Sequence, residues 1–588
     1  MTKLSTTTAV TYVGLYWVVF GALAFVSALG GVFTPALFFF YLFAGGIALS
    51  SARAEALRRA LVPLAPALGI VLTGVLVWSI FTTPTIFTGR DQGSIATAAV
   101  MLAESHALST HTPISDAFFG YYGEGRALNF PGFFYTADGA LTPQFPIPYI
   151  AYLAVFYSIF GVYGFTLANA ILFVLFALSF VVLVQHLAAH VTRKKSARIG
   201  SRHLALTFLL TSFPLMWFFK HTLSENLAQF LIFFMLLQAV LFVHHAHNSL
   251  SRARLHFWTA LLTGALLTFT RIEGIVLVAF LLFAFLLHPR TFAYLRTRLV
   301  SHLFAPAVGL LFALALVFAQ TPNFYKSIAK ALLPSGDAGG ASASFFSNLI
   351  ARYTEYLSYG ILPFLFVGAY GVYTLWRTGR YTALLPAFVT APLVVYLIDP
   401  HISSDAPWML RRMSFALLPI GMLYSILFIL RSSRRTMTLL TVGLIALSLP
   451  AYATFLPFSE NRQLLQQTQA LGAQFTRDDA LLVDASVSGN GFALLSGPLR
   501  AREHKNAAYI FNPADLTRVD FSAFRDVFLI TSADAARRYT DALGQRLAQR
   551  AHLTMTTTRL MHPPYTALWR FPTRDTVTTP IVIFHVRH

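Results

Sequence analysis

The chain has 588 residues, of which 56% are hydrophobic and only 11% are charged, with a net charge of +20 and a mean hydropathy of +0.63. Soluble domains carry about a quarter charged residues, so this composition excludes a soluble enzyme, and the high hydrophobicity excludes a disordered chain. The chain has no Cys, which excludes a disulfide framework, a Cys-ligated metal site and a thiol nucleophile.

Fourteen apolar runs are candidates for membrane spans, because crossing about 30 Å of hydrocarbon takes about 20 helical residues. The runs lie at residues 9–31, 33–50, 60–81, 147–161, 163–186, 203–219, 227–246, 257–271, 273–289, 299–319, 351–376, 381–398, 413–430 and 436–456. The first run is interpreted as an uncleaved anchor rather than a signal peptide, since only Lys3 precedes it and it is long for a signal sequence.

The positions of Lys and Arg predict which side each loop faces. Nineteen basic residues and one acid lie in the segments before residue 9 and at 50–59, 187–202, 247–256, 290–298, 377–380 and 431–435. Such an excess marks cytoplasmic loops. We therefore predict a multi-pass protein of the cell membrane with thirteen spans, a cytoplasmic N-terminus and an extracytoplasmic C-terminal domain. Because topology accounts for most of the net charge, nucleic acid is not an expected partner.

The run at 147–161 is the one that we do not expect to cross. It is short, begins beside prolines and is rich in Tyr. If it crossed, the basic stretch at 193–195 would face outward, against the charge pattern. We predict that this run is an amphipathic helix in the outer interface.

A long outer loop, at about 82–162, contains the first group of candidate site residues. Arg90 and Asp91 lie near its start, before a helix-like stretch at 94–107, and Asp116 and Glu124 follow. Irregular backbone at membrane depth is tolerated where it lines a cavity, so this loop is expected to form the wall of a site. The structural alternatives are that Asp91 caps the helix and that the two later acids are solvated.

Three shorter outer segments carry further ionisable residues, at 224–226, 270–274 and 399–412. Ionisable groups at membrane depth are costly and indicate function by default. The candidates are Arg271, His401 and Arg412. The structural alternatives are an ion pair of Arg271 with Glu273, a hydrogen-bonded His401, and interfacial anchoring by Arg411 and Arg412.

The composition changes after Pro457. Short apolar strands are predicted at 480–485, 527–531 and 581–586, and a polar helix at 533–551. The sequence therefore predicts two parts, a transmembrane domain at 1–456 and a soluble extracytoplasmic α/β domain at 457–588.

These features together resemble the polyprenyl-phosphate-sugar-dependent glycosyltransferases of the GT-C superfamily, which include protein O-mannosyltransferases and lipid A aminoarabinose transferases. The resemblance covers most of the chain: an acid after an early span (Asp91), a loop that returns through a Pro- and Tyr-rich stretch, a late outer Arg (Arg412) and a C-terminal soluble domain. Two features depart from the pattern, because a hairpin at 9–50 precedes the acid and Met413 stands where Tyr often follows the Arg.

The resemblance implies a GT-C-like fold and transfer of a sugar from a polyprenyl-phosphate donor, with inversion, to a hydroxyl of a protein, lipid or glycan. A carboxylate can remove the acceptor proton, and Asp91 is the predicted base, with Asp116 and Glu124 as further candidates. Arg suits bidentate contact with phosphate, so Arg271 and Arg412 are predicted to hold the donor phosphate, with Arg90 and His401 as further candidates. Some relatives use a divalent cation, but no compact carboxylate cluster in the sequence requires one.

Two other classes of function stay open at this point. A transporter or lipid flippase would have midplane sites on broken helices within internal repeats, and no clear repeat is found. A non-catalytic relative that binds a lipid-linked glycan would have the same outer-face residues, so the sequence does not distinguish it.

Overall fold

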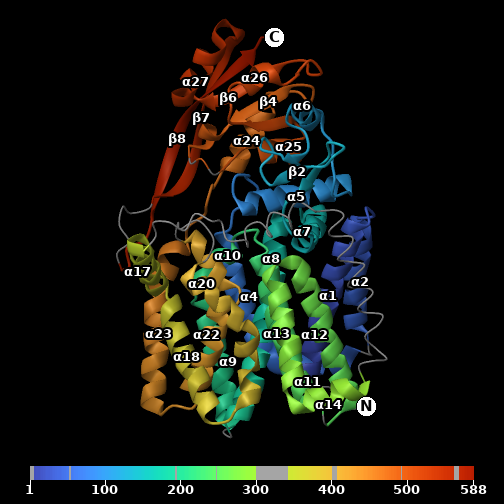
Figure 1. The fold of residues 1–588 in the computed structure, drawn as a ribbon, viewed down its shortest axis with the longest axis vertical. Coiled ribbons are helices and arrows are strands. Elements are labelled where there is room, and N and C mark those ends of the chain that lie inside the picture. The colour runs from blue at the N-terminus through green and yellow to red at the C-terminus, as the bar shows by residue number, and fades with distance from the viewer. Residues whose placement is uncertain are drawn as a thin grey trace.

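The computed structural model describes residues 5–51, 54–192, 195–246, 248–298, 342–399, 407–489, 491, 493–561 and 568–587. A bundle of helices forms one half of the molecule and a domain with a β-sheet forms the other (Figure 1). The N-terminus lies at the end of the bundle opposite the sheet domain, which we call the inner end. The end that contacts the sheet domain is the outer end.

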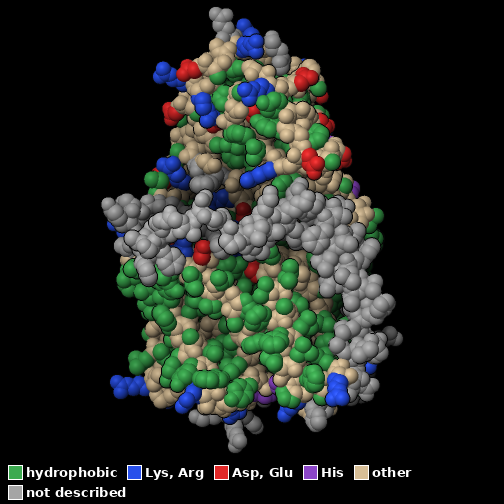
Figure 2. Space-filling model, viewed as in Figure 1, with side chains coloured by type: hydrophobic (Ala, Val, Ile, Leu, Met, Phe, Trp, Pro, Cys, Tyr) green, Lys and Arg blue, Asp and Glu red, His purple; other side chains and the backbone are tan. Residues whose placement is uncertain are grey.

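The bundle contains the membrane-spanning helices. Within the described ranges, six helices are long and apolar enough to cross a membrane, and up to nine if each strongly bent pair is one span. Figure 2 shows hydrophobic side chains over the surface of this half, with Lys and Arg at its inner end. The chain is a multi-pass membrane protein. The predicted span at 299–319 lies outside the described residues, so the total of thirteen stays a prediction.

The bundle is built from helices that overlap the apolar runs, although the runs at 60–81, 203–219 and 381–398 are each divided between shorter helices, and the helices at 55–61 and 289–298 lie mainly in segments predicted as loops. They are α1 (Thr6–Leu29), α2 (Pro35–Ser50), α3 (Glu55–Leu61), α4 (Ala65–Ile80), α8 (Tyr163–Val191), α9 (Lys195–Leu210), α10 (Phe213–Phe219), α11 (Glu225–His245), α12 (Leu250–Thr270), α13 (Glu273–Leu287), α14 (Pro289–Arg298), α19 (Leu385–Thr390), α20 (Val395–Ile398) and α23 (Arg434–Phe455). Helix α11 is the central one, since 94% of its apolar window is buried inside the protein.

Two predicted spans are bent at their outer ends. The run at 351–376 is not one helix, because α17 (Ser342–Ser358) and α18 (Ile361–Arg377) meet at 91°. Gly360 lies between them with φ 73°, a left-handed conformation that favours glycine and permits the turn. The second bend, of 50°, separates the segment Trp408–Ser414, which includes α21 (Arg411–Ser414), from α22 (Leu417–Ile429).

The outer loop folds into short elements at the outer end of the bundle and alongside the sheet domain (Figure 1). These are α5 (Asp91–Ser105), α6 (Pro113–Tyr122), β1 (Gly125–Arg126), β2 (Phe133–Tyr135), β3 (Leu141–Pro143) and α7 (Ile147–Phe160). Helix α7 is the run that we did not expect to cross. It is short, but the prediction of an amphipathic surface helix is wrong. Its residues 147–156 are all buried, because it is apolar all round and packs between α1, α5 and α8.

The C-terminal domain is α/β, as predicted. Its five strands lie in the order β5–β4–β6–β8–β7, with β4 parallel to both neighbours and the last three strands antiparallel. The elements are α24 (Leu464–Gly472), β4 (Ala480–Asp484), α25 (Ser496–Ala501), β5 (Asn506–Ile510), α26 (Asp515–Arg518), β6 (Val527–Ser532), α27 (Ala533–Leu543), β7 (Leu547–Met561) and β8 (Thr573–Val586). The predicted helix at 533–551 is too long, because it ends at Leu543 and residues from 547 onward pair with β8.

The outer loop and the C-terminal domain are joined by direct contacts. Thr88 forms an antiparallel bridge with Leu494, and the Asn129 side-chain amide donates to the Tyr509 carbonyl at 2.7 Å. A Cβ on Gly497 would lie 2.4 Å from Cγ2 of Thr88, so only glycine fits this close approach. These contacts hold the segment that leads into α5, and therefore Asp91, in a fixed place at the outer end of the bundle.

Candidate functional site

A chain of alternating acidic and basic side chains lies at the outer end of the bundle. We call it the ion-pair network. Its members are Asp91, Glu225, Arg271, Glu273, Arg411 and Arg412. They come from the first turns of α5, α11, α13 and α21 and from the turn between α12 and α13. Segments far apart in the sequence thus meet because each begins or ends at the same face of the membrane.

Asp91 is the accessible end of this network. Its Oδ2 atom lies 2.5 Å from Nη1 of Arg411, and its side chain is 37% exposed, whereas that of Arg411 is 9% exposed. The capping alternative is wrong, because Arg90 occupies the N-cap position of α5 and Asp91 is the first helical residue. The carboxylate is therefore held by a guanidinium while facing solvent.

Glu225 joins two arginines in the interior. Its Oε1 atom lies 2.8 Å from Nη1 of Arg271 and 3.8 Å from Nε of Arg411, and the side chain is 3% exposed. A buried carboxylate needs this compensation, since an isolated buried charge is very costly. Glu225 therefore couples the Asp91–Arg411 pair to the rest of the network.

Glu273 is the most heavily bonded carboxylate. Its two oxygens accept from Nη2 and Nε of Arg271 at 2.7 and 3.2 Å, which is a bidentate contact. The Oε1 atom also accepts from Nη1 of Arg412 at 3.1 Å and from the Tyr396 hydroxyl at 2.5 Å. The predicted ion pair of Arg271 and Glu273 exists, but it is one link of a larger network.

Aromatic rings fix the guanidinium planes. The Cζ atoms of Arg90 and Arg411 lie 4.9 and 4.7 Å from the centroid of the Trp408 ring, and that of Arg271 lies 4.6 Å from the Phe415 ring. Such cation–π contacts stabilise each cation by about 0.5–2 kcal/mol. The arginines are thus positioned before any ligand binds.

Two donors of the network are unused within the described ranges. The Nε atoms of Arg411 and Arg412 are buried and have no hydrogen-bond acceptor among the described residues. A buried donor without an acceptor is costly, so these two groups favour an anionic ligand. Each carboxylate of the network already contacts a guanidinium, an arrangement that does not fit a divalent cation.

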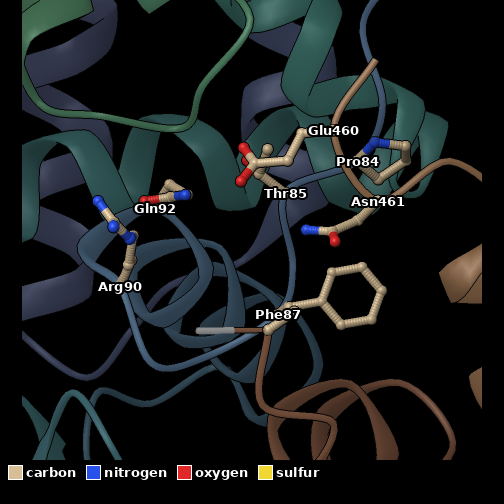
Figure 3. A pocket seen from close by; sticks show the side chains of 8 residues that line it. Pro84, Thr85, Phe87, Arg90, Gln92, Glu460 and Asn461 are labelled. Carbon is tan, nitrogen blue, oxygen red and sulfur yellow. The ribbon is translucent and has the colours of Figure 1, made fainter. Parts of the chain in front are cut away.

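A small pocket lies beside the start of α5 (Figure 3). It is lined by Pro84, Thr85, Phe87, Arg90, Gln92, Glu460, Asn461 and Ala493. Arg90 and Gln92 come from the outer loop, whereas Glu460 and Asn461 come from the linker to the sheet domain. Burial would raise the pKa of Glu460, but a hydrogen bond with His221 and the positive charge of Arg90 hold it below its usual range.

Lys220, near this pocket, has a structural role. Its ammonium donates to the carbonyl oxygens of Phe455, Leu456 and Phe458 at 3.2, 2.7 and 3.0 Å. Helix ends leave carbonyl groups without intrahelical partners, and Lys220 binds carbonyls at the end of α23 and just after it. Burial lowers the pKa of Lys220 to about 7.

The structure brings together some of the predicted site residues and separates others. Asp91, Arg271 and Arg412 lie in the network, and Arg90 lies beside it over Trp408. Asp116 lies on α6, pairs with His111 at 3.1 Å and is exposed, and Glu124 is also exposed. Helix α6 and the turn after it, which carries Glu124, lie against the sheet domain, so these two acids are not in the network. His401 lies outside the described residues.

Three members of the network were not among the predicted site residues, and one of them, Glu273, was noted only as the ion-pair partner of Arg271. Glu225 and Arg411 were noted in outer segments, but neither was assigned a role. Their positions were the available signal. Glu225 is the first residue of an apolar helix, and Arg411 and Arg412 precede another apolar helix. Charged residues at membrane depth are costly, so both positions indicate function. Whether Arg411 or Arg412 contacts Asp91 depends on the orientation of α21, which the sequence does not provide.

Comparisons with known proteins find structures similar to this chain but no match by sequence. No family model matches the chain, and no curated protein matches it. A crystal structure of ArnT from Cupriavidus metallidurans bound to undecaprenyl phosphate matches with a TM-score of 0.51 and 14% identity, covering 89% of this chain and 98% of that chain. The apo structure of the same protein has a TM-score of 0.49 and 11% identity, with the same coverage.

An oligosaccharyltransferase from Archaeoglobus fulgidus is also similar, with a TM-score of 0.45 and 11% identity, covering 87% of this chain and 75% of that chain. At these identities the likeness concerns the fold. The match to undecaprenyl-phosphate-bound ArnT extends over most of both chains. The expected resemblance is therefore confirmed at the level of the fold: this chain has the fold of the GT-C glycosyltransferases.

Proposed function

We propose that this protein is an integral-membrane glycosyltransferase that moves a sugar from a polyprenyl-phosphate donor to an acceptor hydroxyl outside the cytoplasm. The observation that carries the proposal is the ion-pair network, in which only Asp91 is substantially exposed and three arginines are held in place behind it. The similarity in fold to a protein crystallised with undecaprenyl phosphate supports this class of donor.

The arginines suit the phosphate group of such a donor. Arg411 and Arg412 each have an unused Nε donor, and guanidinium groups bind phosphate oxygens bidentately. The network lies at the outer end of the bundle, where the phosphate of a membrane lipid would be found. We infer that these arginines bind the donor phosphate and stabilise the negative charge that develops on it during transfer.

Asp91 suits the role of general base. In the proposed reaction its carboxylate accepts the proton of the acceptor hydroxyl while that oxygen bonds to the anomeric carbon. The bond between the anomeric carbon and the phosphate oxygen breaks, and its electron pair leaves with polyprenyl phosphate. The configuration of the sugar is inverted. The exposure of Asp91 supports this role, because the acceptor approaches from the aqueous side.

The change Arg412→Lys tests the phosphate site. Lysine keeps the charge but loses the planar fork, so we expect undecaprenyl phosphate to bind about tenfold more weakly, the equivalent of one charge-assisted hydrogen bond. Binding of the lipid phosphate to the purified protein would be measured against neutral polyprenol. Arg434→Lys, an exposed position at the N-terminal end of α23, is the matched control and should bind normally. Wild-type affinity in the Arg412 variant would make Arg412 an interfacial anchor.

The orientation of the chain is part of the proposal, since the donor site must face outward. A reporter fused after Ser201 should be cytoplasmic and one after Glu460 should be extracytoplasmic, because the basic loops stay inside. An alkaline-phosphatase fusion, which is active only outside the cytoplasm, would measure each position. The same result at both positions would contradict the topology.

A further inference from the structure

Three histidines meet at the inner end of the bundle, far from the ion-pair network. His186 and His190 lie one helical turn apart near the end of α8, and His244 lies in the last turn of α11. One ligand nitrogen from each lies within 4.8 Å of the others. Helix α8 follows α7, which is at the outer end, so the C-terminal end of α8 lies at the inner end (Figure 1). Nothing in the proposed transfer reaction uses this cluster.

One ring nitrogen of His190 bonds to the backbone and the other faces His244. The Nδ1 atom of His190 lies 2.8 Å from the carbonyl oxygen of His186. A carbonyl oxygen only accepts, so Nδ1 carries the proton and Nε2 has the lone pair. Histidines that bind metals usually donate their other N–H in this way, which fixes the tautomer and the ring orientation.

The spacing of the nitrogens matches a tetrahedral centre. Zinc–nitrogen bonds of about 2.0–2.1 Å at tetrahedral angles place two ligand nitrogens about 3.3 Å apart. The Nε2 atom of His190 lies 3.3 Å from Nδ1 of His244. The third ligand is His186, whose ring centroid is 4.5 Å from that of His190. The ligand nitrogen of His186 lies within 4.8 Å of the other two and would move closer on binding an ion.

His186 provides an independent reason to expect a ligand. Its Nε2 atom is buried and has no hydrogen-bond partner among the described residues. A buried imidazole nitrogen without a partner is costly, and coordination of a metal would satisfy it. His190 is exposed, so an ion can reach the cluster from solvent.

We propose that His186, His190 and His244 bind a zinc ion that joins α8 to α11. Three imidazole nitrogens favour zinc over magnesium or calcium, which prefer oxygen ligands. The fourth position would be taken by water, since the cluster is open on the His190 side. The ion would cross-link two neighbouring helices at the inner end of the bundle.

The test measures zinc bound to the full-length protein, purified in detergent with an affinity tag free of histidine. After removal of metal with a chelator and dialysis against zinc chloride, we expect one zinc ion per chain by elemental analysis and a higher melting temperature than in the metal-free protein. His190→Gln is the decisive variant because the exposed side chain is expected to tolerate the change. It should bind zinc at least tenfold more weakly and lose the shift in melting temperature.

His203→Gln is the matched control, since His203 is exposed on α9 and is not part of the cluster. This variant should bind one zinc ion with wild-type affinity. Absence of stoichiometric zinc in the wild-type protein would overturn the proposal. Equal zinc binding by the wild type and the His190 variant would also overturn it, by placing the ion elsewhere among the 18 histidines. Loss of transferase activity plays no part in this test, so its outcome is independent of the proposed function.

Discussion

Replacing Asp91 with Asn is expected to lower turnover by about 10²-fold or more, because general-base catalysis contributes about 10²–10⁴-fold. Asparagine keeps the shape of the side chain and can still accept a hydrogen bond from Arg411, but it cannot take the acceptor proton. The initial rate of polyprenyl phosphate release at saturating donor would measure the loss, while donor affinity should change much less than the rate.

Asp116→Asn is the comparison for the Asp91 variant. Asp116 is an outer-loop acid of the same type, but it is exposed and pairs with His111 rather than with the network. Its replacement should leave turnover within about twofold of wild type, as for other exposed positions. If the Asp91→Asn protein is properly folded and has near-normal turnover, Asp91 is not the general base. Its role would then be the structural one of holding Arg411.

The change Glu273→Gln is expected to cause the largest loss of stability. It removes the negative charge that pairs with Arg271 and Arg412, on a carboxylate that also accepts a hydrogen bond from the Tyr396 hydroxyl. The Glu273 side chain is only 7% exposed. Breaking a buried ion pair by removing one partner costs on the order of 3–5 kcal/mol. Here Arg271 would keep its contact with Glu225, whereas Arg412 would lose the carboxylate that it contacts. The melting temperature of the purified protein would therefore fall clearly below that of wild type.

Glu124→Gln is the matched control for this loss. Glu124 lies in an exposed turn after α6, so its replacement should change stability by no more than about 0.5 kcal/mol. Glu273→Asp keeps the charge and should recover part of the melting temperature that Glu273→Gln loses. If Glu273→Gln melts as wild type does, the network is not a stabilising element and its arginines are compensated in another way.

The parts of the site that could be predicted follow from topology. Charge counts along the chain predict which loops lie on the outer face, and loops on one face can meet. Asp91, Arg271 and Arg412 were expected in such loops, and the structure joins all three through a continuous chain of ion pairs. The general class of fold was predicted on the same basis, from the order of spans, long loop and soluble domain.

The pairing within the network could not be predicted, because it depends on helix orientation. Arg411 and Arg412 are adjacent in sequence but point in different directions from α21, so one reaches Asp91 and the other reaches Glu273. Successive side chains on a helix are about 100° apart, and the sequence does not say which of the two faces α5. Glu225 was missed for the same reason.

The errors in the fold have related causes. The 533–551 stretch has a helical composition, but residues from 547 onward form β7 because pairing with β8 outweighs local propensity. Helix α7 was predicted as a surface helix from its length and its prolines, yet it is buried between α1, α5 and α8. In both cases distant segments of the chain decide the environment.

The central claim is sugar transfer from a lipid-linked phosphate, and release of polyprenyl phosphate tests it most directly. The purified chain in lipid nanodiscs would be given a panel of labelled polyprenyl-phosphate sugars together with candidate protein, lipid and glycan acceptors. We predict that one donor releases polyprenyl phosphate only when an acceptor is present, that the label moves to this acceptor, and that the Asp91→Asn protein does neither. A wild-type protein that binds the donors but releases polyprenyl phosphate from none of them would contradict the account.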